Sequence, residues 1–107
     1  MADKIIHIAS LDQHNQLTKE GLVIIDFHAS WCGPCHMIAP TYETLAGENE
    51  NIKFFKVDVD NVPDVAQHYK ITAMPTFVIL KDGEKIDEMK GANQGGLTGL
   101  VQKLNNA

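Results

Sequence analysis

Apolar and polar residues follow two different periods along this chain, and the pattern predicts five strands. Residues 22–28 form a nearly continuous apolar run, typical of a strand covered on both faces of a sheet. Residues 52–59 alternate between apolar and polar, as a half-buried strand does. Further strands are predicted at residues 4–9, 75–81 and 84–90, and Asp82-Gly83 between the last two is a strong hairpin signal.

Helical patterns separate these strands. Ser10 followed by Gln13 forms a capping box, which predicts a short helix ending at Gly21. A longer helix is predicted from about Cys32 to Asn49, because apolar residues recur on one face. A short helical stretch covers residues 62–69, and a last helix carries an apolar stripe of Leu97, Leu100, Val101 and Leu104.

The order β-α-β-α-β-α-β-β-α predicts an α/β fold. Alternating strands and helices favour parallel strands with helices on both faces, and the terminal hairpin makes the sheet mixed. The 107 residues suit one domain, so we expect a single domain over residues 1–107.

Composition and charge exclude several classes of function. The net charge of −5 argues against a protein that binds nucleic acid or an anionic membrane, because either would need a basic face. The first ten residues lack the apolar core of a signal peptide, and no apolar run approaches membrane-spanning length. We therefore expect a cytoplasmic protein.

The segment WCGPCHM, residues 31–37, holds both cysteines of the chain and has three interpretations. Cys-x-x-Cys beside a βαβ pattern indicates a dithiol redox site, Cys-x-x-Cys-His is also a haem-attachment signature, and two cysteines with a histidine are possible zinc ligands. Haem attachment is disfavoured because it requires export and a haem-enclosing fold. Zinc is disfavoured because a structural site needs about four ligands and the other histidines are scattered.

The redox interpretation assigns different roles to the two cysteines. Residues three apart at a helix start share a face, and a tightened turn would let them form a disulfide. Gly33 permits a sharp turn, and Pro34 suits the first helical turn. The helix amino end favours the Cys32 thiolate, whereas Cys35 should be more buried and keep its proton longer. Cys32 would then attack a disulfide and Cys35 would resolve the mixed disulfide.

Asp26 is the candidate proton acceptor for Cys35. It lies inside the apolar run, where burial should raise its pKa and make it a usable general base or acid. Lys56 lies in another predicted strand and is either a partner of Asp26 or an exposed lysine, since the sequence does not set the register between strands.

The segments DFHASWCGPCHMIAP, AMPTF and KDGE, together with Gly91, resemble the thioredoxin family from about residue 4 to the end. The resemblance implies the thioredoxin fold, a single three-layer domain whose central mixed five-stranded sheet is flanked by four helices. It implies that Cys32 attacks, Cys35 resolves, Asp26 is a buried acid near Lys56, and Pro75 is a cis-proline. It also implies that target proteins dock on a flat apolar patch of Trp31, Gly33, Pro34, Ala73, Met74, Gly91 and Ala92. His28 and His36 depart from the Trp and the Lys or Arg common in the family.

The resemblance implies a disulfide reductase with no bound cofactor and no metal, whose redox-active group is the Cys32–Cys35 disulfide. Its electrons would come ultimately from NADPH through a thioredoxin reductase, its substrates would be disulfide-containing proteins, and the chain would be a monomer. The alternatives are a metal-binding module or a non-catalytic interaction module of the same fold. The non-catalytic module is disfavoured because both thiols, Asp26 and Pro75 are all present.

Overall fold

The computed structural model describes residues 4–107, which form the predicted alternation of strands and helices. The strands are β1 (Ile5–His7), β2 (Leu22–His28), β3 (Ile52–Asp58), β4 (Thr76–Lys81) and β5 (Glu84–Lys90). The helices are α1 (Leu11–Leu17), α2 (Gly33–Glu48), α3 (Pro63–His68) and α4 (Gln94–Asn105). None of these helices is long and apolar enough to cross a membrane.

The strands form one mixed five-stranded sheet in the order β1-β3-β2-β4-β5. β3 pairs in parallel with β1 and β2, whereas β4 runs antiparallel to both β2 and β5. The predicted hairpin at Asp82-Gly83 is confirmed, and both residues have positive φ, +52° and +86°, as a two-residue hairpin turn requires. The apolar run of β2 therefore lies at the centre of the sheet, as predicted.

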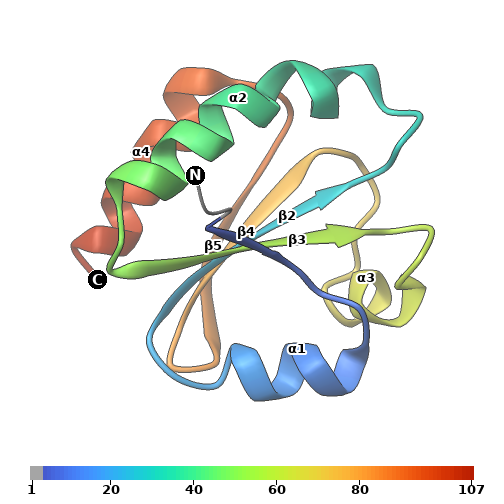
Figure 1. Cartoon of the computed structure of the whole chain (residues 1–107), viewed down its shortest axis with the longest axis horizontal. Helices are drawn as coiled ribbons and strands as arrows, with labels where there is room; N and C mark the ends of the chain where they lie inside the picture. The colour runs from blue at the N-terminus through green and yellow to red at the C-terminus, as the bar shows by residue number, and fades with distance from the viewer. Residues whose placement is uncertain (1–3) are drawn as a thin grey trace.

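Helices cover both faces of the sheet in three layers (Figure 1). α2 and α4 pack on one face, where Ile24, Phe54 and Phe77 point, and α1 and α3 lie on the other. Because successive side chains of a strand point to opposite faces, Val23, Ile25 and Phe27 of β2 belong to the α1 and α3 side. Both faces of β2 are therefore buried.

Two elements are shorter than predicted by three residues or more. β1 covers three residues instead of residues 4–9, because it pairs only with β3 and only over Ile5–His7. α1 ends at Leu17 instead of Gly21, since the Thr18 hydroxyl donates to the His14 carbonyl at 2.8 Å and caps the last turn. The start of α1 is as predicted, with Ser10 Oγ accepting from the Gln13 amide at 3.1 Å.

Candidate active site

The cysteine pair lies where β2 ends and α2 begins. Cys32 is the N-cap of α2 and Cys35 lies in its first turn, with the Cα atoms 5.3 Å apart and the two sulfurs joined in a disulfide. The Cys35 amide donates to Cys32 Sγ at 3.2 Å, and Pro34 occupies the start of the helix, where its missing N–H has no partner to lose. Cys32 Sγ thus sits at the positive end of the helix with an amide directed at it.

The expected difference in burial between the two cysteines is wrong for this disulfide form. Cys32 is 4% exposed and Cys35 is 5% exposed. The bonded sulfurs share the same cover, because Ala29 packs against them and half-buried Val59 and Met74 close over the group. The local helix position did not reveal this cover, since it comes from segments distant in sequence.

An exposed rim surrounds the covered disulfide. Trp31 is 67% exposed, and its Nε1–H donates to Asp60 Oδ2 at 2.9 Å. Gly33 and Pro34 are also exposed on the outer side of the turn. The indole is therefore held beside the cysteines by one hydrogen bond and presents its ring to solvent.

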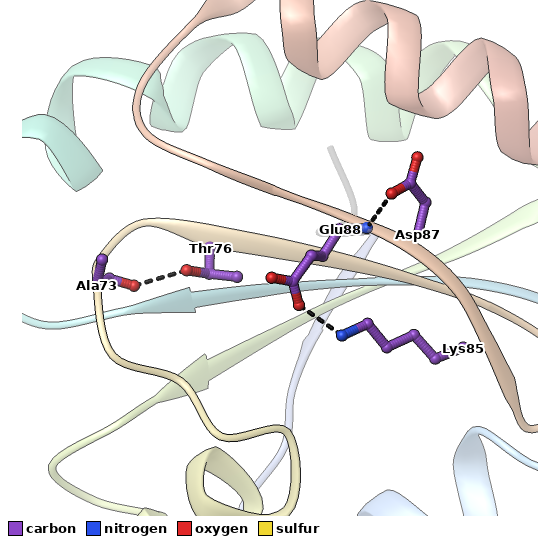
Figure 2. A network of polar contacts seen from close by, with 5 residues as sticks. All are labelled: Ala73, Thr76, Lys85, Asp87 and Glu88. Atoms are coloured by element: carbon purple, nitrogen blue, oxygen red, sulfur yellow. Dashed lines mark hydrogen bonds and ion pairs between the residues drawn. The ribbon is translucent and has the colours of Figure 1, made fainter.

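The segment before β4 completes the rim. The Met74-Pro75 peptide is cis, as the family resemblance implied. The Thr76 hydroxyl donates to the Ala73 carbonyl at 2.6 Å (Figure 2). This bond closes the turn that carries Met74, which packs against the cysteines. The Gly91 amide donates to the Pro75 carbonyl at 2.9 Å, so Gly91, which has φ of +98°, lies beside the same turn. Ala73 and Ala92 are exposed.

Asp26 is buried in the middle of the sheet, 1% exposed, and no described residue donates a hydrogen bond to its Oδ1. Burial raises the pKa of the Asp26 carboxyl to about 7, and the nearby Lys56 ammonium opposes that rise. The register, which the sequence left open, places Asp26 directly opposite Lys56 on β3. The two residues are therefore neighbours, and Lys56 is half-buried rather than fully exposed.

Asp26 lies on the face of the sheet that α2 covers. It is two residues along β2 from Ile24, which packs under α2, and side chains two apart on a strand share a face. Tyr42 of α2 is close enough that the Asp26 carboxylate contributes to raising the pKa of the Tyr42 hydroxyl, after the larger effect of burial. The carboxyl thus lies beneath the same helix that carries the cysteine pair at its amino end.

Two histidines stand near the site. His28 ends β2, is half-buried, and its Nε2 is buried without a partner among the described residues. His36 Nε2 lies 2.8 Å from the Ser30 carbonyl, so its ring links the first turn of α2 to the loop before it. Within residues 4–107, no group of three or more histidine, cysteine or carboxylate side chains is placed to hold a metal ion.

Sequence reasoning missed two residues of the site, Asp60 and Val59. Asp60 orients Trp31 although 29 residues separate them, and Val59 covers the disulfide. Both follow β3 at the edge of the sheet where β2 also ends. The carboxyl ends of neighbouring parallel strands meet at one edge of the sheet. The place of these two residues directly after a predicted strand was therefore the signal that could have identified them.

Comparison with known proteins places this geometry in a family. A family model described as Thioredoxin matches residues 4–105. A thioredoxin of Coprinus comatus is 53% identical over 100 residues, which cover 90% of this chain and 93% of that protein. A thioredoxin of Ictalurus punctatus is 44% identical, with 94% and 96% covered.

Solved structures agree with the sequence comparisons. The crystal structure of thioredoxin from Trypanosoma brucei brucei superposes with a TM-score of 0.93 at 30% identity, covering 100% of this chain and 96% of that one. The thioredoxin of Malassezia sympodialis gives a TM-score of 0.88 at 42% identity, with 92% and 89% covered.

Proposed function

The chain belongs to the thioredoxin family and is a thiol–disulfide oxidoreductase with protein-disulfide reductase activity, and from that premise we propose a role for each residue of the site. Cys32 is the attacking thiol and Cys35 the resolving thiol. The observation that carries this assignment is the Cys35 amide, which donates to Cys32 Sγ at the amino end of α2. An amide and the positive end of a helix stabilise a thiolate, and the thiolate is the nucleophile in disulfide exchange.

Exchange proceeds in two steps. The Cys32 thiolate attacks a disulfide sulfur of the target, which forms a mixed disulfide and releases one target thiolate. Cys35 then attacks Cys32 Sγ, which regenerates the Cys32–Cys35 disulfide and releases the second target thiolate. The target gains two electrons and the cysteine pair loses two.

Asp26 serves the second step as general base. Cys35 must lose its proton before it can attack, and a carboxyl whose pKa burial raises to about 7 can accept a proton near neutral pH. Lys56, opposite Asp26, offsets part of the cost of the buried negative charge.

The exposed rim is the docking surface for targets. Trp31, with Ala73, Met74, Gly91 and Ala92 on the facing segments, offers apolar surface around the disulfide, and Gly33 and Pro34 complete it. The backbone of Met74 next to Pro75 would pair with an extended segment of the target, as an added strand does.

We further propose that the chain works as a single domain over residues 1–107 and as a monomer in the cytoplasm. It binds no cofactor of its own. Disulfide-containing proteins are its substrates, and a thioredoxin reductase returns its electrons from NADPH. The family supports these assignments, since an exchange reaction that oxidises the cysteine pair needs a source of electrons to begin again.

Single-cysteine variants test the two thiol roles. Cys35→Ser should accumulate a mixed disulfide through Cys32 with a disulfide-containing protein such as insulin, because the resolving thiol is missing. Cys32→Ser should neither form the adduct nor turn over. Non-reducing electrophoresis and mass spectrometry measure the adduct. An adduct on Cys35 in the Cys32→Ser protein at a comparable rate would reverse the assignment.

A further inference from the structure

A row of polar side chains crosses the carboxyl ends of the three parallel strands. The register pairs His7 with Lys56 and Lys56 with Asp26, and one step further along it pairs His28 with Asp58. All five side chains lie on the α2 face, because the residues two before Asp26 and Lys56 belong to the core beneath α2. Charged and titratable groups thus gather on this edge beside the cysteine pair.

Two polar side chains of the sheet flank the buried carboxyl of Asp26 among the described residues, and Tyr42 of α2 also lies near it. On the α2 face, Ile24 precedes it on β2 and Phe77 lies opposite it on β4, and both are apolar and 0% exposed. The other two neighbours are Lys56 across β3 and His28, two residues further along β2. His28 follows Asp26 by two residues on the same face of β2, toward the strand ends, and Asp26 Oδ1 and His28 Nε2 are both buried without a partner among the described residues.

Lys56 and His28 both line a cavity of about 330 Å³ at the strand ends. His7, Asp58 and Asn61 also line it. His7 and Asn61 are exposed, so the cavity opens to solvent on their side. The cavity therefore reaches from the surface to Lys56 and His28, which flank Asp26 in the sheet.

Of Lys56 and His28, it is His28 that can take a proton from Asp26. A lysine ammonium has three donor hydrogens and no acceptor, whereas a neutral imidazole carries one acceptor nitrogen and one donor. His28 Nε2 is buried and accepts no hydrogen bond from the described residues. Burial lowers the pKa of His28, Lys56, His7 and His36 lower it further, and Asp58 opposes them, so the ring is neutral and able to accept near pH 7.

We infer that His28 relays the proton that Asp26 takes from Cys35 to solvent through this cavity while Cys35 resolves the mixed disulfide. The inference rests on the role proposed above for Asp26 as general base. His28 acts through Asp26, so it is a positioning residue for the proton and not a catalytic residue.

Over one turnover, the proton that leaves Cys35 is matched by the proton that the target thiolate takes up. Cys35 gives its proton to the Asp26 carboxylate, and the resulting thiolate forms the Cys32–Cys35 disulfide while the target leaves as a thiolate. Protonated Asp26 passes the proton to His28, which becomes an imidazolium and releases it to buffer or water in the cavity. The target thiolate takes up one proton from the same solvent, and the relay moves no electrons.

Reduction of dithiobis(nitrobenzoate) by the prereduced full chain separates the steps, because attack and resolution each release one coloured thionitrobenzoate. In stopped-flow at pH 7 and low buffer concentration, His28→Gln should slow the second release by about tenfold and leave the first unchanged. This is less than the roughly 10²–10⁴ of direct general acid–base catalysis, because water still reaches the cavity. Added imidazole should restore the second release in His28→Ala, where the missing ring leaves room, and should not affect the wild type.

His36→Gln is the matched control, since His36 lies beside the same site but does not line the cavity. It should show neither the slow second release nor rescue by imidazole. Equal second-release rates in His28→Gln and wild type, or slowing of both releases without rescue, would overturn the relay. Asp26→Asn separates the two proposals, because a normal second release in that variant would refute the general base itself. A slow second release in Asp26→Asn with a normal one in His28→Gln would refute the relay alone.

Discussion

The Asp26 carboxyl links the chemistry of the site to the stability of the fold. Burial raises its pKa in the folded chain to about 7, whereas an unfolded aspartate titrates near pH 3.9. Between about pH 4 and 7 the folded chain therefore holds a proton that the unfolded chain has lost. The free energy of unfolding falls as the pH rises through this window and levels off above it, the opposite of an ion-paired carboxylate.

Asp26→Asn should remove this loss of stability, because the amide has nearly the same shape and stays neutral at every pH. Relative to wild type, the free energy of unfolding of the variant should rise by about 2–4 kcal/mol between pH 4.5 and pH 8. Urea unfolding of both oxidised proteins at four pH values measures the difference. Any fixed cost of the unpaired amide cancels, because it is present at both ends of the range.

Asp12→Asn on the exposed side of α1 is the control for Asp26, because its side chain lies in solvent. It should leave the pH profile of stability parallel to that of wild type. A constant difference between Asp26→Asn and wild type from pH 4.5 to 8 would show that burial does not hold the proton on Asp26.

At the scale of the elements, continuous local patterns were sufficient to predict the fold. The apolar run of β2, the Asp82-Gly83 turn and the stripe of α4 each needed only neighbouring residues, and all three are as predicted. The extent of β1 depends instead on pairing with β3, so the sequence pattern overestimated it. The element order follows from local patterns, whereas strand ends depend on partners distant in sequence.

The features of the site likewise fall into those that a local pattern predicts and those that depend on distant partners. The cysteines at the start of α2 and the buried Asp26 follow from local pattern, and the structure places both as expected. The pairing of Asp26 with Lys56 requires a register between two strands, which no local pattern contains. The contact of Trp31 with Asp60 likewise requires the tertiary fold, because the two residues lie on different loops.

The backbone of α4 offers a test of element stability. Gly99 lies inside the helix, is exposed, and a Cβ added to it would meet nothing within 4 Å. Gly99→Ala should therefore raise the free energy of unfolding by about 0.5–1 kcal/mol, since alanine has the higher helix propensity and no clash opposes it. Urea unfolding of the oxidised protein at pH 7 measures the gain.

Gly21→Ala is the counterpart in a turn. Gly21 has φ of +84°, a conformation that costs alanine roughly 1 kcal/mol, so the same substitution should lower the free energy of unfolding. Opposite signs at these two exposed glycines would confirm that backbone conformation decides the outcome. A loss of stability in Gly99→Ala would contradict the helical, uncrowded environment of that position.

At the scale of the whole molecule, folding and redox state are coupled through the cysteine pair. Cys32 and Cys35 enclose a loop of only four residues, but Val59 and Met74 come from distant segments to cover it. The folded chain therefore holds the two sulfurs together, whereas the unfolded chain must lose entropy to do so. Unfolding and reduction together form a thermodynamic cycle. The difference in unfolding free energy between the oxidised and reduced forms therefore fixes the difference in reduction potential between the folded and the unfolded chain.

Reduction with dithiothreitol should accordingly lower the free energy of unfolding by roughly 2 kcal/mol, the chain-entropy value for so short a loop. By the cycle, the disulfide of the folded chain should have a reduction potential about 40 mV below that of the unfolded chain. A lower potential makes the folded dithiol the better electron donor, which is the direction a disulfide reductase needs. Urea unfolding of both forms gives the difference in unfolding free energy, and equilibration with glutathione in water and in urea gives the difference in reduction potential.

The control is Cys35→Ser, which forms no internal disulfide and should unfold identically with and without the reductant. If the oxidised and reduced wild type were equally stable, the fold would contribute nothing to the reducing power of the cysteine pair, and that power would have to come from the tetrapeptide alone.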